Sequence, residues 1–306
     1  MTHTVAVTAP AKINLSLGVG PMRPDGFHTL ATVYQAVGVH DRVTVSDAET
    51  TTVTVRGETS LPVGDVPTDE SNIAVRAARL LAEHHGLDRA VRIEIDKAIP
   101  VAGGMAGGSA DAAASLLACD HLWRLHTPRE ELMALAAELG SDVPFSLVGG
   151  TALGTGRGEL LAPLITSGEY WWVVLESPRG LSTPAVYREF DALHPGPVLD
   201  DPEIPDELLR ALRSHDVAGL GRALVNDLQP AALRLRPELA AVLDRGRRES
   251  AYGAVVSGSG PTCLFLCESL PHADHVAGAL ARADLGPVSF APGPVPGARV
   301  IARDAP

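Results

Sequence analysis

The stretch Pro100–Ala113 constrains this chain more than any other, because four of its fourteen residues are glycine and five are alanine. It follows a strand-like segment, Ala90–Ile95, and leads into an alanine- and leucine-rich helical pattern that runs to about Leu125. Glycine lets the backbone approach a ligand closely, and a helix that begins after it directs free N–H groups and its positive dipole end toward that ligand. The stretch therefore predicts an anion-binding loop, such as a phosphate site, in preference to a flexible turn.

This loop does not match the two best-known phosphate-binding patterns. The pattern GxxxxGK[ST] is absent, and Met105 breaks the G-x-G-x-x-G spacing of a dinucleotide fingerprint. The formal net charge of −12 argues against nucleic acid as the partner, because duplex binding depends on Lys and Arg neutralising many phosphates. A small anionic ligand needs only a local positive site, so the sequence leaves it open.

Lysine is scarce: only Lys12 and Lys97 stand among 25 basic residues, and the others are arginine. A compact ammonium and a planar guanidinium serve different contacts, so these two positions are candidates for functional cations. Lys12 begins an alternating strand pattern in which Asn14 and Ser16 share its face. A solvated strand face is the alternative for this row of polar residues.

Asp142 is the candidate acid–base residue. It follows Gly140, which ends a predicted helix, and it precedes Val143–Pro144, where proline disfavours further helix. A catalytic carboxylate and an N-cap for a short turn, Phe145–Leu147, fit this spacing equally well.

The whole pattern mixes strands and helices, which indicates an α+β fold in two lobes with a boundary near residue 160. A glycine-rich segment, Ser257–Gly260, interrupts an apolar strand pattern and favours a close backbone approach there. Strands are predicted at Thr4–Thr8, Lys12–Val19, Leu30–Val39, Arg42–Ser46, Thr51–Arg56, Ala90–Ile95 and Trp171–Glu176, and helices at Asn72–His85, Thr183–Leu193, Asp206–Ser214, Asp216–Leu224, Glu238–Glu249 and Pro271–Ala283.

Three features predict a cytoplasmic protein without a membrane segment. No apolar run approaches the ~18 residues of a transmembrane helix. The first four residues show no basic segment followed by an apolar core, so we expect no signal peptide. The three cysteines (Cys119, Cys263 and Cys267) lack metal-binding spacing and are expected to be buried thiols in a reducing compartment.

These features, in this order, resemble the GHMP kinase superfamily. The resemblance runs through essentially the whole chain, and its most specific parts lie near Lys12 and Asp142. It implies a two-lobed GHMP kinase fold, with an ATP-binding domain at residues 1–160 and a C-terminal α/β sandwich domain at 161–306, whose last strand returns to the first lobe. The segments that carry it are Pro10–Leu15, Arg23–Leu30, Pro100–Ala113 and Gly140–Phe145.

The resemblance is closest to the superfamily branch whose acceptor is a polyol linked to cytidine diphosphate, in isoprenoid precursor synthesis without mevalonate. It implies phosphorylation of an acceptor hydroxyl by ATP with Mg²⁺, with Asp142 as catalytic carboxylate and Lys12 as its partner. Ser109 is implied as a Mg²⁺ contact. The implied ATP-binding residues are Pro100, Val101, Ala102, Gly103, Gly104, Met105, Ala106, Gly107, Gly108, Ser109, Asn72 and Lys97.

The same resemblance implies a grip on the cytidine end of the acceptor. The chain carries Phe27 where relatives often have tyrosine, and Ala102 and Ala106 where they often have glycine. The implied substrate-binding residues are Asn14, Phe27, His28, Thr183, Tyr187, Gly258 and Ser259.

Two other functions remain as alternatives. One is a different small-molecule kinase of the same superfamily, of the homoserine or mevalonate type, for which the cytidine-side residues would serve no purpose. The other is a non-catalytic nucleotide sensor, which predicts the loss of Lys12 or Asp142, although both are present. We expect a monomer or a weak homodimer.

Overall fold

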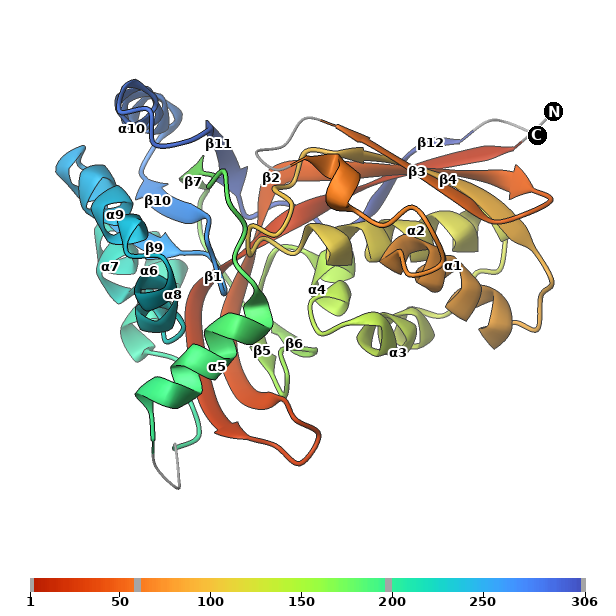
Figure 1. Cartoon of the computed structure of the whole chain (residues 1–306), viewed down its shortest axis with the longest axis horizontal. Helices are drawn as coiled ribbons and strands as arrows, with labels where there is room; N and C mark the ends of the chain where they lie inside the picture. The colour runs from red at the N-terminus through yellow and green to blue at the C-terminus, as the bar shows by residue number, and fades with distance from the viewer. Residues whose placement is uncertain (1–2, 58–61, 196–199, 304–306) are drawn as a thin grey trace.

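The computed structural model describes residues 3–57, 62–195 and 200–303, which fold into two lobes lying side by side (Figure 1). In the first lobe, helices cover one face of a large sheet, and in the second a cluster of helices covers a smaller sheet. The predicted α+β fold in two lobes is confirmed. The expectation about a signal peptide partly concerns residues 1–2, which lie outside the described residues.

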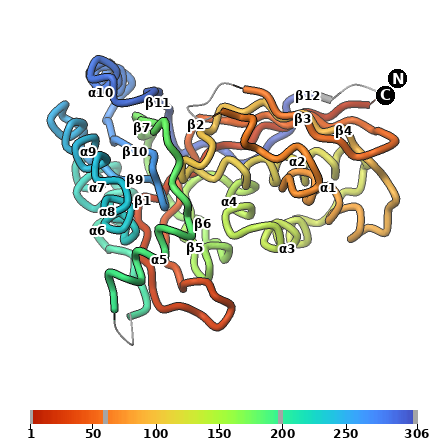
Figure 2. Tube along the Cα trace, viewed as in Figure 1, coloured from red at the N-terminus to blue at the C-terminus, as the bar shows by residue number. Residues whose placement is uncertain are grey.

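Two long strands form the centre of the molecule. β1 (Thr4–Met22) and β2 (His28–Ala48) pair antiparallel, so the residues predicted there are confirmed as strands, but the breaks predicted within each strand are wrong. A register shift between Pro10 and Ala11 takes up the irregular residues as a bulge, which lets β1 continue. Figure 2 shows the pair leaving the first lobe and passing beside the second.

The first sheet has the strand order β12-β1-β2-β4-β3, with β5 and β6 attached beside β2. The last described strand pairs antiparallel with β1, which joins the C-terminal segment to the first lobe. The predicted domain boundary after residue 160 falls at β6 and stays a prediction. The strands are β3 (Thr52–Gly57), β4 (Ala90–Lys97), β5 (Thr151–Thr155), β6 (Leu160–Pro163), β8 (Val225–Asn226) and β12 (Arg299–Arg303).

One central helix, α2 (Gly107–Trp123), organises the first lobe. Twelve of its 17 residues are buried, so it has no solvated face along most of its length. Its alanines allow α1, β1 and β2 to approach closely. The other helices here are α1 (Ile73–His84), α3 (Arg129–Leu139), α4 (Val143–Val148) and the short 3-10 helix η1 (Val63–Asp65).

The second lobe is built on a sheet of order β11-β7-β10-β9. Helix α8 was not predicted, because seven residues show too little periodicity to be recognised. The strands are β7 (Tyr170–Leu175), β9 (Gly253–Val256), β10 (Cys263–Cys267) and β11 (Val288–Gly293), and the helices are α5 (Thr183–Leu193), α6 (Asp206–Ser214), α7 (Val217–Ala223), α8 (Gln229–Leu235), α9 (Glu238–Arg248) and α10 (Leu270–Arg282).

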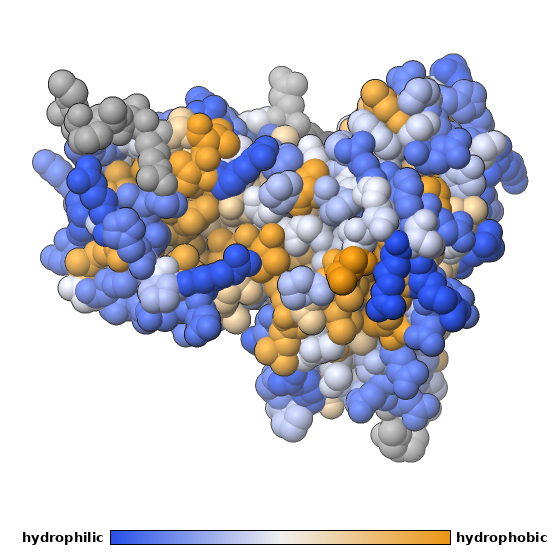
Figure 3. Space-filling view, turned by 180° about the vertical axis from the view of Figure 1, so that it is seen from behind, coloured by the Kyte–Doolittle hydropathy of each residue, from blue (hydrophilic) through white to orange (hydrophobic). Residues whose placement is uncertain are grey.

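Across the described ranges, no helix is long and apolar enough to cross a bilayer. The three cysteines are free and buried, as predicted. Seen from behind, apolar side chains gather in the middle of the face, where the two lobes meet, and hydrophilic side chains surround them (Figure 3).

A buried hydrogen-bonded chain joins the two lobes. The indole Nε1 of Trp172 on β7 donates to Gln35 Oε1 on β2 at 2.9 Å, and Gln35 Nε2 donates to Thr151 Oγ1 at 3.2 Å. Trp172 and Gln35 are fully buried, so neither has water as an alternative partner. This chain therefore fixes the second sheet against the first.

We predict that Trp172→Phe lowers the free energy of unfolding by about 2–4 kcal/mol, because it leaves the buried Gln35 oxygen unpaired and removes volume from the core. Urea unfolding checks this. Trp171→Phe, on the partly exposed face of the same strand, is the control and should cost under about 1 kcal/mol. Equal losses in the two variants would contradict the role of the hydrogen bond.

Candidate active site

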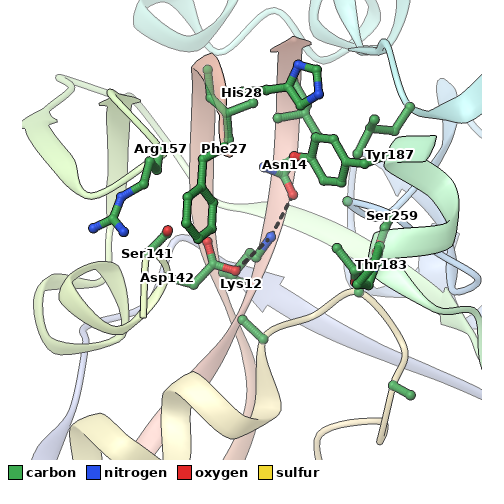
Figure 4. Close-up of a pocket in the computed structure, with 18 of the residues that line it drawn as sticks. Lys12, Asn14, Phe27, His28, Ser141, Asp142, Arg157, Thr183, Tyr187 and Ser259 are labelled. Atoms are coloured by element: carbon green, nitrogen blue, oxygen red, sulfur yellow. Dashed lines mark hydrogen bonds and ion pairs between the residues drawn. The ribbon is translucent and has the colours of Figure 1, made fainter. Parts of the chain in front are cut away.

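A cleft of about 640 Å³ opens between the lobes, large enough for a nucleotide-sized ligand. Its lining comes from β1, the β1–β2 turn, the glycine-rich loop before α2, the start of α4, α5 and the turn after β9 (Figure 4). Segments far apart in the sequence thus meet at one place.

The structure brings sixteen of the 21 predicted site residues to this cleft. The five that do not line it are Val101, Met105, Ser109, Asn72 and Lys97. Those that do are Lys12, Asn14, Phe27, His28, Pro100, Ala102, Gly103, Gly104, Ala106, Gly107, Gly108, Asp142, Thr183, Tyr187, Gly258 and Ser259.

The glycine-rich loop is held tightly from two sides. A Cβ on Gly104 would lie 2.1 Å from the carbonyl oxygen of Ser257, so only glycine fits there. Ser257 Oγ donates to the Gly104 carbonyl at 3.1 Å, and the backbone N–H of Lys12 donates to the Met105 carbonyl at 3.2 Å. The loop is therefore a fixed cradle between β1 and the turn after β9.

The N-terminus of α2 faces the cleft without a side-chain cap. Its N-cap residue is Ala106, whose side chain has no acceptor for the free N–H groups of the first turn. Gly107 and Gly108 open this turn and line the cleft. This arrangement of free N–H groups and positive dipole end suits a phosphate group.

Two alanines of the loop adopt left-handed backbone conformations, with φ of 51° at Ala102 and 59° at Ala106. This conformation costs alanine roughly 1 kcal/mol of free energy because its Cβ crowds the backbone, whereas glycine adopts it freely. The loop is therefore stiffer and more strained than a glycine loop of the same shape.

We predict that Ala102→Gly and Ala106→Gly leave stability unchanged or raise it by up to about 1 kcal/mol, since relief of strain offsets the added entropy of the unfolded chain. Ala110→Gly, inside α2, is the control and should lower stability by about 1 kcal/mol. Thermal unfolding of the three variants checks this. A loss at position 102 as large as that at 110 would contradict the strain.

Asp142 stands at the N-cap position of α4, yet its side chain makes no capping hydrogen bond, so the cap interpretation is wrong. Its Oδ2 lies 3.4 Å from Lys12 Nζ, and its Oδ1 accepts a hydrogen bond from the hydroxyl of Tyr34 at 3.1 Å. Asp142 keeps 29% of its side chain exposed, toward the cleft. The carboxylate is therefore available to a ligand.

Lys12 is oriented by its neighbours on β1 and β2. Its Nζ donates to Asn14 Oδ1 at 2.9 Å (Figure 4). Asn14 Nδ2 in turn donates to Thr32 Oγ1 at 2.8 Å. A Cβ on Gly258 would come within 3.5 Å of Lys12 Nζ, so the turn after β9 closes over the ammonium. The solvated-face interpretation of this row is wrong, because Lys12, Asn14 and Ser16 are all buried.

The two remaining ATP-side residues, Asn72 and Lys97, are engaged within the protein. Asn72 caps α1, accepting from the N–H of Ala74 at 2.8 Å and donating to the Pro67 carbonyl at 2.7 Å. Lys97 lies beneath the loop, where a Cβ on Gly107 would be 3.1 Å from its Nζ. Lys97 therefore supports the loop from outside the cleft, and Asn72 fixes the start of α1.

Lys97 forms a buried ionic cluster with two aspartates. Its Nζ contacts Asp41 Oδ2, and it lies 2.7 Å from Asp111 Oδ2 on α2. Burial lowers the pKa of Lys97, but Asp111 and Asp41 outweigh that effect and raise it. Burial, opposed by Lys97 and reinforced by Asp41, raises the pKa of Asp111 to about 8. The ammonium of Lys97 thus lies between two buried carboxyl groups, and burial favours the protonated form of Asp111.

We predict that Asp41→Asn costs about 3–5 kcal/mol of stability, because it removes one of the two carboxyl groups that hold the buried Lys97 charge. Asp41 Oδ1 also accepts the N–H groups of Ala98 and Ile99. Asp111→Asn is the matched control and should cost less, because Asp111 Oδ2 contacts Lys97 and its Oδ1 has no hydrogen-bond partner among the described residues. Chemical unfolding at pH 7 checks the difference. A larger loss for Asp111→Asn would contradict the larger role of Asp41.

The other end of the cleft carries aromatic and hydroxyl groups. The His28 and Tyr187 rings are stacked, with centroids 5.3 Å apart, and His28 Nδ1 donates to the Gly20 carbonyl at 2.8 Å. Thr183 Oγ1 and Ser259 Oγ are hydrogen-bonded at 2.8 Å, which joins the start of α5 to the turn after β9. This end offers flat faces and short polar groups, which suit a heterocyclic base.

Tyr34, Arg157 and Asp191 are among the cleft residues that sequence reasoning missed. Tyr34 contacts Asp142 from β2, and Arg157 lies with its Cζ 5.1 Å from the Phe27 ring centroid. Asp191 Oδ1 lies 3.2 Å from His28 Nε2 but outside hydrogen-bond geometry. The alternation of Leu30–Val39 put Tyr34 on a defined strand face, but only the pairing of β1 with β2 shows which residues it meets.

Two family models match the chain. The GHMP kinases N terminal domain matches residues 72–150, and the GHMP kinases C terminal model matches residues 208–284. A curated relative from Nocardioides sp. strain JS614, named 4-diphosphocytidyl-2-C-methyl-D-erythritol kinase, is 54% identical over 96% of this chain and 98% of its own. A relative of the same name from Thermobifida fusca is 53% identical over 97% of this chain and 98% of its own.

A solved structure of 4-(cytidine 5'-diphospho)-2C-methyl-D-erythritol kinase superposes with a TM-score of 0.76 at 35% sequence identity, covering 95% of this chain and 99% of that one. The two chains are therefore similar in both sequence and fold over nearly their full lengths.

Proposed function

Because the chain belongs to the GHMP kinases, in the branch whose curated members are named 4-diphosphocytidyl-2-C-methyl-D-erythritol kinase, we propose that its cleft transfers the γ-phosphoryl group of ATP to the 2-hydroxyl of 4-diphosphocytidyl-2-C-methyl-D-erythritol. The protein is a kinase with an alcohol group as acceptor. Lys12 and Asp142 are in contact beside the glycine-rich loop, and this contact supports placing the reacting hydroxyl at that end of the cleft.

The reacting end needs a proton acceptor and a cation. The hydroxyl proton passes to the Asp142 carboxylate as the alcohol oxygen forms its bond to the γ-phosphorus, and the bond to the β–γ bridging oxygen breaks to release ADP. Lys12, 3.4 Å from that carboxylate, stabilises the negative charge that develops on the alcohol oxygen. A tertiary alcohol is a weak acid, so both groups are needed close to it.

The ATP end rests on the glycine-rich loop. The uncapped first turn of α2 would bind the phosphates through backbone N–H groups, and the tight contact of Gly104 with Ser257 keeps the loop in that shape. Among the described residues, no group of three or more His, Cys, Asp or Glu side chains is arranged to hold a metal. Mg²⁺ would be held mainly by the ATP phosphates, and the contact predicted at Ser109, which lies in the first turn of α2 but does not line the cleft, stays a prediction.

The cytidine end rests on His28, Phe27 and Tyr187. His28 Nδ1 donates to the Gly20 carbonyl, which fixes the ring, while Nε2 has no hydrogen-bond partner among the described residues although Asp191 Oδ1 lies 3.2 Å from it. The polar edge of a base, such as that of cytosine with its exocyclic amino group, can hydrogen-bond to this ring nitrogen and carboxylate. Phe27, half exposed at the rim of the cleft, offers a face for stacking.

The alternatives fit less well. A homoserine or mevalonate acceptor lacks a base, so the unpaired His28 Nε2 and the aromatic end would have nothing to bind. A homoserine kinase structure from Cytophaga hutchinsonii has a similar fold, with a TM-score of 0.70, but only 21% identity. A nucleotide sensor has no need of Lys12 and Asp142 in contact.

The test is ADP release from Mg-ATP by the purified protein with 4-diphosphocytidyl-2-C-methyl-D-erythritol, and with homoserine or mevalonate as other acceptors. We expect turnover with the cytidine acceptor and a loss of about 10²–10⁴-fold in kcat for Asp142→Asn, because the proton acceptor is removed. Asp88→Asn, an exposed residue outside the cleft, is the matched control and should keep full activity.

Turnover only with another acceptor would overturn the cytidine assignment and keep the kinase. Full activity in Asp142→Asn would overturn the role of this carboxylate. Binding of ATP without turnover on any acceptor would favour the sensor.

A further inference from the structure

Tyr34 is a buried tyrosine in direct contact with the carboxylate at the reacting end. It lies on β2 opposite Asn14 of β1 and is only 2% exposed. Its hydroxyl donates to Asp142 Oδ1 at 3.1 Å, while the other carboxylate oxygen is the one near Lys12. The two oxygens of Asp142 therefore have different environments.

The fold makes room for the hydroxyl of Tyr34. A Cβ on Gly158 would lie 2.2 Å from the Tyr34 oxygen, and a Cβ on Gly154 would lie 2.6 Å from its Cε2. Both glycines belong to the β5–β6 hairpin, which pairs with β2 beside the tyrosine. Any other residue at 158 would displace the hydroxyl, so the hairpin forms a slot that fits this group.

The ring of Tyr34 is held as firmly as its hydroxyl. The Phe145 ring of α4 lies with its centroid 5.0 Å away, and Lys12 Nζ lies 5.3 Å from the Tyr34 ring centroid. The same side chain thus contacts α4, which carries the carboxylate's backbone, and the ammonium that partners it.

We propose that Tyr34 is a positioning residue that fixes the Asp142 carboxylate through Oδ1, so that Oδ2 stays free, beside Lys12, to receive the acceptor hydroxyl. The inference rests on the proposed function of Asp142. A carboxylate held at one oxygen loses less freedom in the transition state, which raises kcat without adding to substrate binding.

The protonation of Tyr34 agrees with a donor role. Burial, and then the negative charge of Asp142, raise the pKa of Tyr34 well above its ordinary value. The hydroxyl therefore stays protonated and can donate a hydrogen bond to the carboxylate. The charged and titratable groups near this pair are Lys12 on β1, Tyr187 on α5 and Glu159 after β5, and none of them changes in the variant described next.

The test is Tyr34→Phe, which removes the hydroxyl and keeps the ring. We expect kcat to fall on the order of 10-fold, with KM for ATP and for the cytidine acceptor nearly unchanged. In the Asp142→Asn background, Tyr34→Phe should have no further effect on the residual rate, because the hydrogen bond acts through the carboxylate. Tyr170→Phe, whose buried hydroxyl donates to Leu212 outside the cleft, is the control and should keep full activity.

A second arm needs no substrate and no turnover. In a crystal structure of Tyr34→Phe, the Asp142 side chain should occupy more than one rotamer, whereas it should occupy one in the parent protein. If the parent protein shows no turnover, the proposed function is overturned. The crystal structure of Tyr34→Phe then still decides whether Tyr34 positions the Asp142 side chain.

Three results would overturn the inference. They are an unchanged kcat in Tyr34→Phe, a change confined to KM, and a single unaltered Asp142 rotamer in its crystal structure.

Discussion

The site depends on one constraint of space: the backbone at Gly104 lies so close to the carbonyl of Ser257 that no side chain fits between them. This contact joins the phosphate loop of the first lobe to the turn of the second. The same turn, at Gly258, closes over the ammonium of Lys12. The cradle, the cation and the lobe interface are therefore a single arrangement, and a shift in one moves the others.

Electrostatics at the cleft are local, although the chain carries a net charge of −12. The positive end of α2 and the ammonium of Lys12 supply the field at the cradle. Lys97 adds little to it, because Asp41 neutralises its charge below the loop. An acidic protein can thus offer a site for a polyanion through a helix terminus and a few local cations, which here also include Arg157 and Arg188 of the cleft lining.

Local patterns in the sequence predicted the parts of the site whose chemistry is local. The glycine-rich loop and the helix after it follow from spacing and turn chemistry. The contacts of Tyr34 and the burial of Lys97 with Asp41 do not, because they arise where strands distant in sequence pair and where α2 crosses the sheet. The long strands β1 and β2 were divided for a related reason: a bulge looks like a break until its partner strand is known.

The scarcity of lysine has a practical consequence for chemistry done on this protein. Of the two lysine amines, that of Lys97 is sealed in an ion cluster, and that of Lys12 faces the cleft beside the carboxylate. Reagents that acylate amines on most proteins would find few side-chain targets on this surface. An amine-directed electrophile carried on an ATP-shaped or cytidine-shaped molecule would therefore meet one reactive side chain, at the centre of the site, with almost no competing background from lysines elsewhere.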